Sequence, residues 1–205
     1  MAKRSAPEIN AGSMADIAFL LLIFFLVTTT IDKDKGLVRQ LPPPLDDEIV
    51  PPIIKEKNLF VVLVNANNDL LVEDEPMELK DLRQAAKDFL DNGGIPAGQE
   101  GYCDYCQGSR SPSSSDNPDK AIISMSSARK TDYTTYIAVQ NELGAAYNEL
   151  RDRESQRLFG WKYTEVKAAI AAGNYEGNEE KAKEKLKEVR ALIPFKLSEA
   201  EPQSN

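Results

Sequence analysis

The sequence predicts a single-pass membrane protein: one N-terminal transmembrane α-helix followed by a small α/β domain, an α+β two-layer sandwich. Three observations lead to this prediction. Residues 14–31 form an apolar run that contains one ionisable residue, Asp16. Residues 42–57 are rich in proline. From residue 58 onward, short β-branched runs alternate with segments of helical periodicity, which is typical of helices packed on a sheet.

The apolar run is long enough to cross a bilayer as a helix. At roughly 1.5 Å per residue, about eighteen residues just span a hydrocarbon core of about 30 Å. A secretory signal peptide is one alternative, because Lys3 and Arg4 precede the run, but no Ala-x-Ala-like cleavage site follows it. A buried core helix is a second alternative. Polar residues on both sides of the run disfavour it, Glu8 before the run and residues 32–35 after it. We therefore expect a retained transmembrane helix over residues 14–31.

The flanking charges predict the orientation of this helix. Lys3 and Arg4 precede it with no acid until Glu8, whereas the charges of residues 32–35 alternate in sign. The positive-inside rule then places the amino terminus in the cytoplasm. Residues 1–13 are expected to be a cytoplasmic tail, and the chain beyond the helix is expected to be exported.

Asp16 is the most informative residue of the apolar run. A carboxylate at the centre of a bilayer costs about 2.5 to 3.5 kcal/mol, so an intramembrane Asp is by default a functional residue that faces protein or water. A structural role is the alternative. Asp16 lies near the amino-terminal end of the run, where the helix dipole favours negative charge.

Composition limits the chemistry of the exported part. The 205 residues include 33 acids and 25 bases, for a net charge of −8. An acidic surface disfavours nucleic acid and anionic lipid headgroups as partners. The chain has no His, which removes His-based acid–base catalysis, Ser-His and Cys-His nucleophiles and His-ligated metals.

Patterning along the chain divides the exported part. Residues 36–41 are expected to form a brief strand, and 32–57 a stiff proline-rich linker, because proline excludes helix. The domain is expected over 58–200 and a short tail over 201–205. In chain order, the expected elements are a hairpin over 59–64 and 70–72, a helix over 79–90, a strand over 121–125, a helix over 133–150 that Asp132 caps, helices over 163–172 and 179–192, and a strand over 193–197.

A long loop over residues 94–119 interrupts this pattern and carries Cys103 and Cys106. A Cys-x-x-Cys pair suggests a thiol oxidoreductase, but a redox site belongs at a helix start, and this loop is rich in Gly, Ser and Pro. Zinc needs four ligands, so only two such loops meeting in a dimer could hold it. We expect a local disulfide, no metal site and no cofactor.

Several of these segments resemble the ExbD/TolR family of biopolymer transport proteins. The residues that carry the resemblance are Asn10, Asp16 six residues later, Leu41 and Pro42 after the apolar run, and Asp132 and Tyr133 at the head of a helix. The resemblance covers about residues 7–90 and 120–150. The chain departs from the family at Ser13, where a Pro is expected, in the Cys-bearing loop, and in a helical insertion at about 151–190.

The resemblance implies an ExbD-like subunit of a motor in the bacterial inner membrane, driven by the proton-motive force. Two copies would pair their helices inside a pentameric ring of an ExbB-like polytopic protein and drive a TonB-like transducer that energises outer-membrane transport. The domain would then be periplasmic. Asp16 would carry protons, because desolvation favours the neutral form of a carboxyl group and water the charged form.

Other polar residues of the first helix follow from the same resemblance. Thr28, Thr29 and Thr30 would either bond helix carbonyls or line a proton exit, and Ser13 is a further polar candidate for the proton path. The family also leaves open a TolR-like role as a cell-envelope anchor that binds peptidoglycan. We expect a protein without enzymatic activity, with a membrane-anchored thiol oxidoreductase as the enzyme-class alternative.

Overall fold

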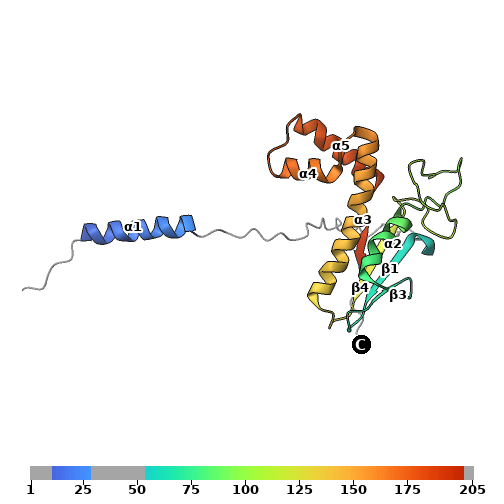
Figure 1. The fold of residues 1–205 in the computed structure, drawn as a ribbon, viewed down its shortest axis with the longest axis horizontal. Helices are drawn as coiled ribbons and strands as arrows, with labels where there is room; N and C mark the ends of the chain where they lie inside the picture. The colour runs from blue at the N-terminus through green and yellow to red at the C-terminus, as the bar shows by residue number, and fades with distance from the viewer. Residues whose placement is uncertain (1–10, 29–53, 201–205) are drawn as a thin grey trace, which may run out of the picture. The chain divides into compact units, whose positions relative to one another are not determined.

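The computed structural model describes residues 11–28 and 54–200 (Figure 1). The chain divides into two compact units, Met1–Val50 and Pro51–Asn205, which are treated separately below. The strand expected over 36–41, most of the linker, residues 1–10 of the expected cytoplasmic tail and the C-terminal tail over 201–205 lie outside the described residues.

The first unit contains helix α1 (Ala11–Thr28). Its large apolar side chains are exposed; Phe24 and Phe25, for example, are 64% and 70% exposed. Among the helices in the described residues, none reaches the combination of length and apolar character that crossing a membrane requires. The transmembrane helix expected from the sequence ends at Ile31, outside the described residues, and stays a prediction.

Within residues 54–200, the chain forms a mixed five-stranded sheet in the order β3-β2-β1-β4-β5. The central strand β1 (Leu59–Val64) runs antiparallel to β2 (Leu70–Val72) and parallel to β4 (Ile122–Ser127). At the edges, β3 (Glu75–Met77) is antiparallel to β2, and β5 (Leu197–Glu199) is parallel to β4.

Helices α2 (Leu79–Leu90) and α3 (Tyr133–Phe159) cover one face of this sheet (Figure 1). The alternation of β1 turns Phe60, Val62 and Val64 into the core, where their burial contributes about 1.5 to 3 kcal/mol each. The helices contribute, among others, Leu82, Ala86, Phe89, Val139, Leu143 and Tyr147. The small α/β domain expected from the sequence is confirmed.

Strand β3 was not predicted from the sequence. Glu73 and Asp74 both have positive φ, 52° and 67°, and form a two-residue hairpin loop that reverses the chain after β2. The next three residues, Glu-Pro-Met, have little strand propensity, and Pro76 is tolerated because β3 is an edge strand.

The region after residue 150 is helical. Helix α3 extends to Phe159, nine residues beyond its expected end, and Gly160 ends it in the left-handed conformation at φ 77°. Helices α4 (Tyr163–Ala171) and α5 (Glu179–Leu192) confirm the two helices expected there. A separate small core joins them to the end of α3: Tyr163, Val166, Ala182, Leu186 and Val189, with Phe159, Trp161, Ile170 and Tyr175 packed against it.

The expected last strand over 193–197 is wrong in its bounds. Ile193 still belongs to the end of α5, because its N–H donates to Val189, and its side chain is buried. Pro194 has no N–H to donate to a neighbouring strand. Pairing with β4 therefore begins only at Leu197.

Candidate functional site

Asp16 lies on the second turn of α1, because the helix begins at Ala11. The favourable effect of the helix dipole fades beyond the first turn, so the dipole does little to explain an acid at this position. The Asp16 side chain is exposed among exposed apolar side chains such as Ile17 and Phe19. A carboxylate on an apolar helix surface needs protein or water as its neighbour.

The hydroxyl of Thr28, at the other end of α1, donates a hydrogen bond to the carbonyl of Phe24 at 2.8 Å. Of the two roles that the sequence left open for the threonines, Thr28 therefore has the bond to a helix carbonyl. The other predicted positions near this helix, Asn10, Thr29, Thr30, Leu41 and Pro42, lie outside the described residues, as does the side chain of Ser13.

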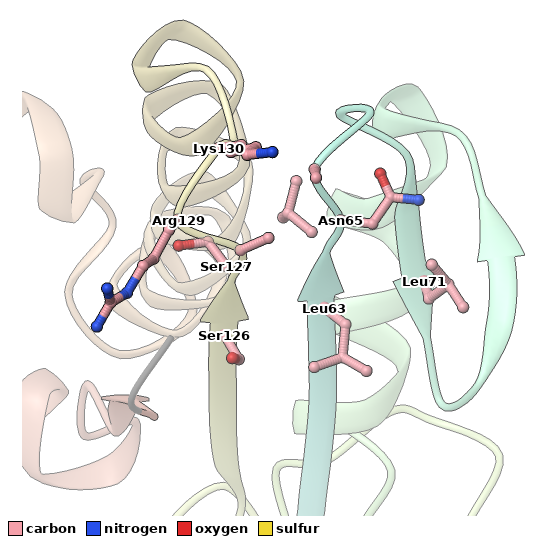
Figure 2. Close-up of a pocket in the computed structure, with 10 residues that line it drawn as sticks. Leu63, Asn65, Leu71, Ser126, Ser127, Arg129 and Lys130 are labelled. Carbon is pink, nitrogen blue, oxygen red and sulfur yellow. The ribbon is translucent and has the colours of Figure 1, made fainter. Parts of the chain in front are cut away.

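The second unit has a pocket of about 350 Å³ at the carboxyl ends of β1 and β4 (Figure 2). In α/β sheets, ligands bind where parallel strands end in this way. Figure 2 shows Leu63 and Leu71 on neighbouring strands below Asn65 and Lys130. The remaining lining comes mainly from the end of β4, including Ser127, and from the residues that follow it.

Two loops that frame this pocket are joined by hydrogen bonds. Asp132 Oδ2 accepts from Asn68 Nδ2 at 2.9 Å, and the N–H of Asp132 donates to Asn68 Oδ1 at 2.8 Å. The Thr131 hydroxyl donates to the carbonyl of Asn65 at 3.0 Å. Asp132 occupies the N-cap position of α3, but its side chain makes no capping bond, so the predicted capping role is wrong. Tyr133 follows with 76% of its surface exposed.

The long loop between α2 and β4 contains a disulfide between Cys103 and Cys106, three positions apart in the sequence, with Cα atoms 5.5 Å apart. Both residues are buried, and Arg110 donates to both of their carbonyls at 3.1 and 2.7 Å. Gly93, at φ 64°, packs so closely that a Cβ there would lie 2.8 Å from Cys106 Cβ. A buried pair without a helix start does not provide the exposed thiolate of a redox site.

An ionic contact attaches the same loop to the start of the domain. Asp116 accepts from Lys57 at 2.5 Å and from Asn58 Nδ2 at 3.2 Å, next to the 3-10 helix η1 (Glu56–Asn58). Burial opposes ionisation of Asp116, but the hydrogen bonds from Lys57 and Asn58 outweigh it and hold the pKa of this carboxyl below its usual value.

Tyr105, between the two cysteines, joins the loop to the C-terminal helices. Its hydroxyl donates to the carbonyl of Leu192 at 2.7 Å, and its own carbonyl accepts from Arg153 at 3.4 Å. Arg153 also binds Asp91 at 2.5 Å and Glu154 at 3.0 Å. Burial, and to a smaller extent the charge of Glu154, raises the pKa of Tyr105 to about 12.

A family model described as "Biopolymer transport protein ExbD/TolR" matches residues 2–151, more than half of the chain. The chain belongs to the ExbD/TolR family. A search of curated proteins found no match. Membership confirms the resemblance seen in the sequence and assigns the protein to a family of biopolymer transport proteins associated with the inner membrane, which work with ExbB/TolQ-type and TonB/TolA-type partners.

The ExbD/TolR match includes every predicted motif position. Asp16 and Thr28 lie on α1 in the first unit, and Asp132 and Tyr133 lie at the start of α3 in the second. The match ends inside α3, yet β5 pairs with β4 and completes the sheet. Sequence analysis missed Asn68 and Lys130, whose only signal was that they lie in turn-forming segments.

Replacing Cys103 and Cys106 together by Ala is expected to leave transport intact and to lower stability modestly. Closing so short a loop contributes about 2 kcal/mol in the chain-entropy model. Denaturant unfolding of the full chain in detergent, beside a transport assay in cells, tests this expectation. Loss of transport with the domain still folded would instead support a redox or metal role for the pair.

Proposed function

We propose that this protein is the ExbD-like subunit of a motor in the inner membrane, driven by the proton-motive force, that energises TonB-dependent transport across the outer membrane. The observation that carries the proposal is Asp16, the one ionisable residue of an apolar run, placed on the second turn of α1. Family membership supports a role in energised biopolymer transport. It does not distinguish an ExbD-like from a TolR-like role, and the ExbD-like role is our proposal.

The proposed topology is a helix over residues 14–31 that spans the inner membrane, with a cytoplasmic amino terminus and a periplasmic domain. The exposed apolar surface of α1 supports this topology. Leaving a Leu or Phe side chain in water instead of burying it costs about 1.5 to 3 kcal/mol. Lipid or partner helices would remove that cost along most of α1.

In the proposed mechanism, Asp16 takes up a proton from one aqueous side and releases it to the other. Apolar surroundings favour the neutral carboxyl and water favours the carboxylate, so alternating surroundings drive uptake and release. Each proton that crosses 100 mV delivers about 2.3 kcal/mol. The Thr28 hydroxyl is already bonded to a helix carbonyl, so its contribution to the path is secondary.

The proposed assembly follows from the cost of an acid in lipid. One helix cannot shield its own carboxylate, so protein must surround Asp16 on several sides. Two copies of this chain inside a pentameric ring of an ExbB-like protein would meet that requirement. In this role the protein has no catalytic activity of its own and needs no cofactor other than protons.

Copurification of the full chain from its own membranes tests this function. The proposal predicts an ExbB-like ring protein in the purified complex and a TonB-like transducer captured after cross-linking. The Asp16→Asn chain, as a control, should copurify with the same ring protein, because assembly does not require the charge. Capture of Tol-type partners together with peptidoglycan would favour the TolR-like role, and a lone active monomer would contradict both.

A further inference from the structure

The loop between α2 and β4 folds around one buried side chain, Asn92, which is 1% exposed. Asn92 precedes Gly93, and this is the only Asn-Gly pair in the sequence. Asparagine is chemically labile before glycine, because glycine has no side chain to hinder attack by its backbone nitrogen. We propose that Asn92 is a modification site: when the loop opens, the side-chain amide is hydrolysed, and the product prevents the loop from closing again. The proposal is independent of the function of Asp16.

The Asn92 side chain uses all of its hydrogen-bonding capacity on the loop. Its Nδ2 donates to the carbonyl of Ser111 at 2.9 Å and to the carbonyl of Ser115 at 2.7 Å. Its Oδ1 accepts from the Ser109 hydroxyl at 3.0 Å and from the N–H of Ser111 at 2.9 Å. An amide has two N–H donors and an oxygen with two lone pairs, so no position is left over. These bonds hold residues 109–115 close to the end of α2.

The backbone around this side chain is closely packed as well. The N–H of Arg110 donates to the carbonyl of Asn92 at 3.0 Å. A Cβ at Gly108 would lie 2.7 Å from the Cα of Asn92. A Cβ at Gly94 would lie 2.5 Å from the carbonyl oxygen of Ser111. Glycine permits these close backbone approaches, and the closed loop therefore has no room for an additional main-chain atom.

The reaction needs water and no other reactant. The backbone nitrogen of Gly93 attacks the side-chain carbonyl carbon of Asn92 and forms a new C–N bond. The Nδ2 group leaves as ammonia, which takes up the proton of the attacking N–H. Water then opens the cyclic imide at one of its two carbonyl groups. One opening gives aspartate, and the other gives isoaspartate, in which the main chain runs through the former side chain and is one atom longer.

The closed loop opposes both steps of this reaction. Departure of Nδ2 removes its two hydrogen bonds, to the carbonyls of Ser111 and Ser115, inside the protein. Burial of Asn92 also excludes the water that the second step requires. The reaction therefore starts from the open loop, and its rate is the rate in an unfolded chain multiplied by the fraction of molecules in which the loop is open.

The products do not fit the closed loop. An aspartate at position 92 would place a carboxylate oxygen where Nδ2 lies, facing the carbonyl oxygens of Ser111 and Ser115. A buried carboxylate oxygen that faces acceptors is unfavourable. An isoaspartate would add a main-chain atom where Gly94 and Gly108 already lie against their neighbours. Each opening that ends in reaction therefore leaves the loop open.

Peptide mapping by mass spectrometry of the full chain in detergent tests the proposal. The chain is incubated at mildly alkaline pH, either folded or unfolded in urea, and the deamidated fraction at Asn92 is followed over time. We expect the folded chain to react at least about tenfold more slowly than the unfolded chain. Ser109→Ala removes one of the four bonds and should speed the reaction of the folded chain about two- to tenfold. Ser113→Ala is the matched control, because its hydroxyl bonds the Ser111 hydroxyl rather than Asn92, and should leave the rate unchanged.

Asn92→Asp reproduces one product and tests whether the loop then stays open. The probe is cleavage by trypsin after Arg110, which requires the loop to open. We expect this cleavage to be at least about fivefold faster in Asn92→Asp than in the parent chain. Asn67→Asp, at an exposed asparagine in the turn between β1 and β2, should be cleaved there as slowly as the parent. The rate comparison with Ser109→Ala keeps Asn92 itself and does not depend on the folding of Asn92→Asp.

Three outcomes would overturn the proposal. Equal deamidation in the folded and the unfolded chain would show that the closed loop does not protect Asn92. Equal rates for Ser109→Ala and Ser113→Ala would show that the bonds to the Asn92 side chain do not control the opening. Cleavage after Arg110 that is no faster in folded Asn92→Asp than in the parent would show that the modified loop closes normally.

Discussion

Replacing Asp16 by Asn is expected to abolish proton-driven uptake while the complex still assembles. Asparagine keeps the size and hydrogen bonding of the side chain but cannot bind and release a proton. No charge has to be desolvated, so the variant should assemble at least as readily as the parent. Receptor-dependent uptake in cells that carry only the variant, together with copurification of the complex, measures both parts of this prediction.

Three further variants serve as controls for this result. Asp16→Glu still titrates but is one methylene longer, so a remnant of uptake is expected. Asp34→Asn removes an acid that follows the apolar run, and should leave uptake unchanged. Thr28→Val should have a small effect, because the hydroxyl mainly bonds a helix carbonyl and water can replace it in a relay. Normal uptake with Asp16→Asn would show that the carboxylate is structural.

The second large expected effect is on the stability of the domain. Arg153→Met removes the guanidinium that binds Asp91 and Glu154, and Glu154 is fully buried. Breaking a buried ion pair by removing one partner costs about 3 to 5 kcal/mol. Arg153 is partly exposed and Glu154 keeps its bond from Arg157 at 2.7 Å, so we expect a loss of about 1 to 3 kcal/mol. The melting temperature should fall by about 3 to 10 °C.

The single tryptophan makes this effect measurable in the full chain. Trp161 stacks on Phe159 in the small core of the C-terminal helices, so its fluorescence reports on their unfolding. Lys162→Met is the matched control, because its ion pair with Glu165 is exposed and such pairs contribute about 0 to 1 kcal/mol. Equal melting temperatures for Arg153→Met and Lys162→Met would show that the buried network does not stabilise the domain.

The sequence predicted the elements that contribute most to the core. Leu59–Val64 was recognised as a continuous apolar, β-branched run, and Leu79–Leu90 by the helical spacing of its apolar residues; in the structure, alternate residues of the strand and one face of the helix are buried. Strand β3 was missed because the turn at Glu73 and Asp74 creates it, and its own residues carry no apolar pattern. Whether a short edge strand forms depends more on pairing with the neighbouring strand than on the strand propensity of its own residues.

Of the two candidate sites, the sequence likewise predicted one and missed the other. Asp16 stands out in the sequence because an acid in an apolar run violates a local expectation. The pocket gave no such signal, because Leu63 and Leu71 read as ordinary strand residues and Lys130 as a turn residue. The bond between Asn68 and Asp132 joins residues that are 64 positions apart, which no local pattern reveals, and it explains why the expected helix cap is absent.

Proton flux into liposomes that contain the purified complex tests the central claim most directly. With a membrane potential applied and the transducer present, the parent complex should acidify the lumen, and the complex carrying Asp16→Asn should do so no faster than empty liposomes. Equal flux through both complexes would contradict the account, because protons would then cross without the carboxyl group of Asp16.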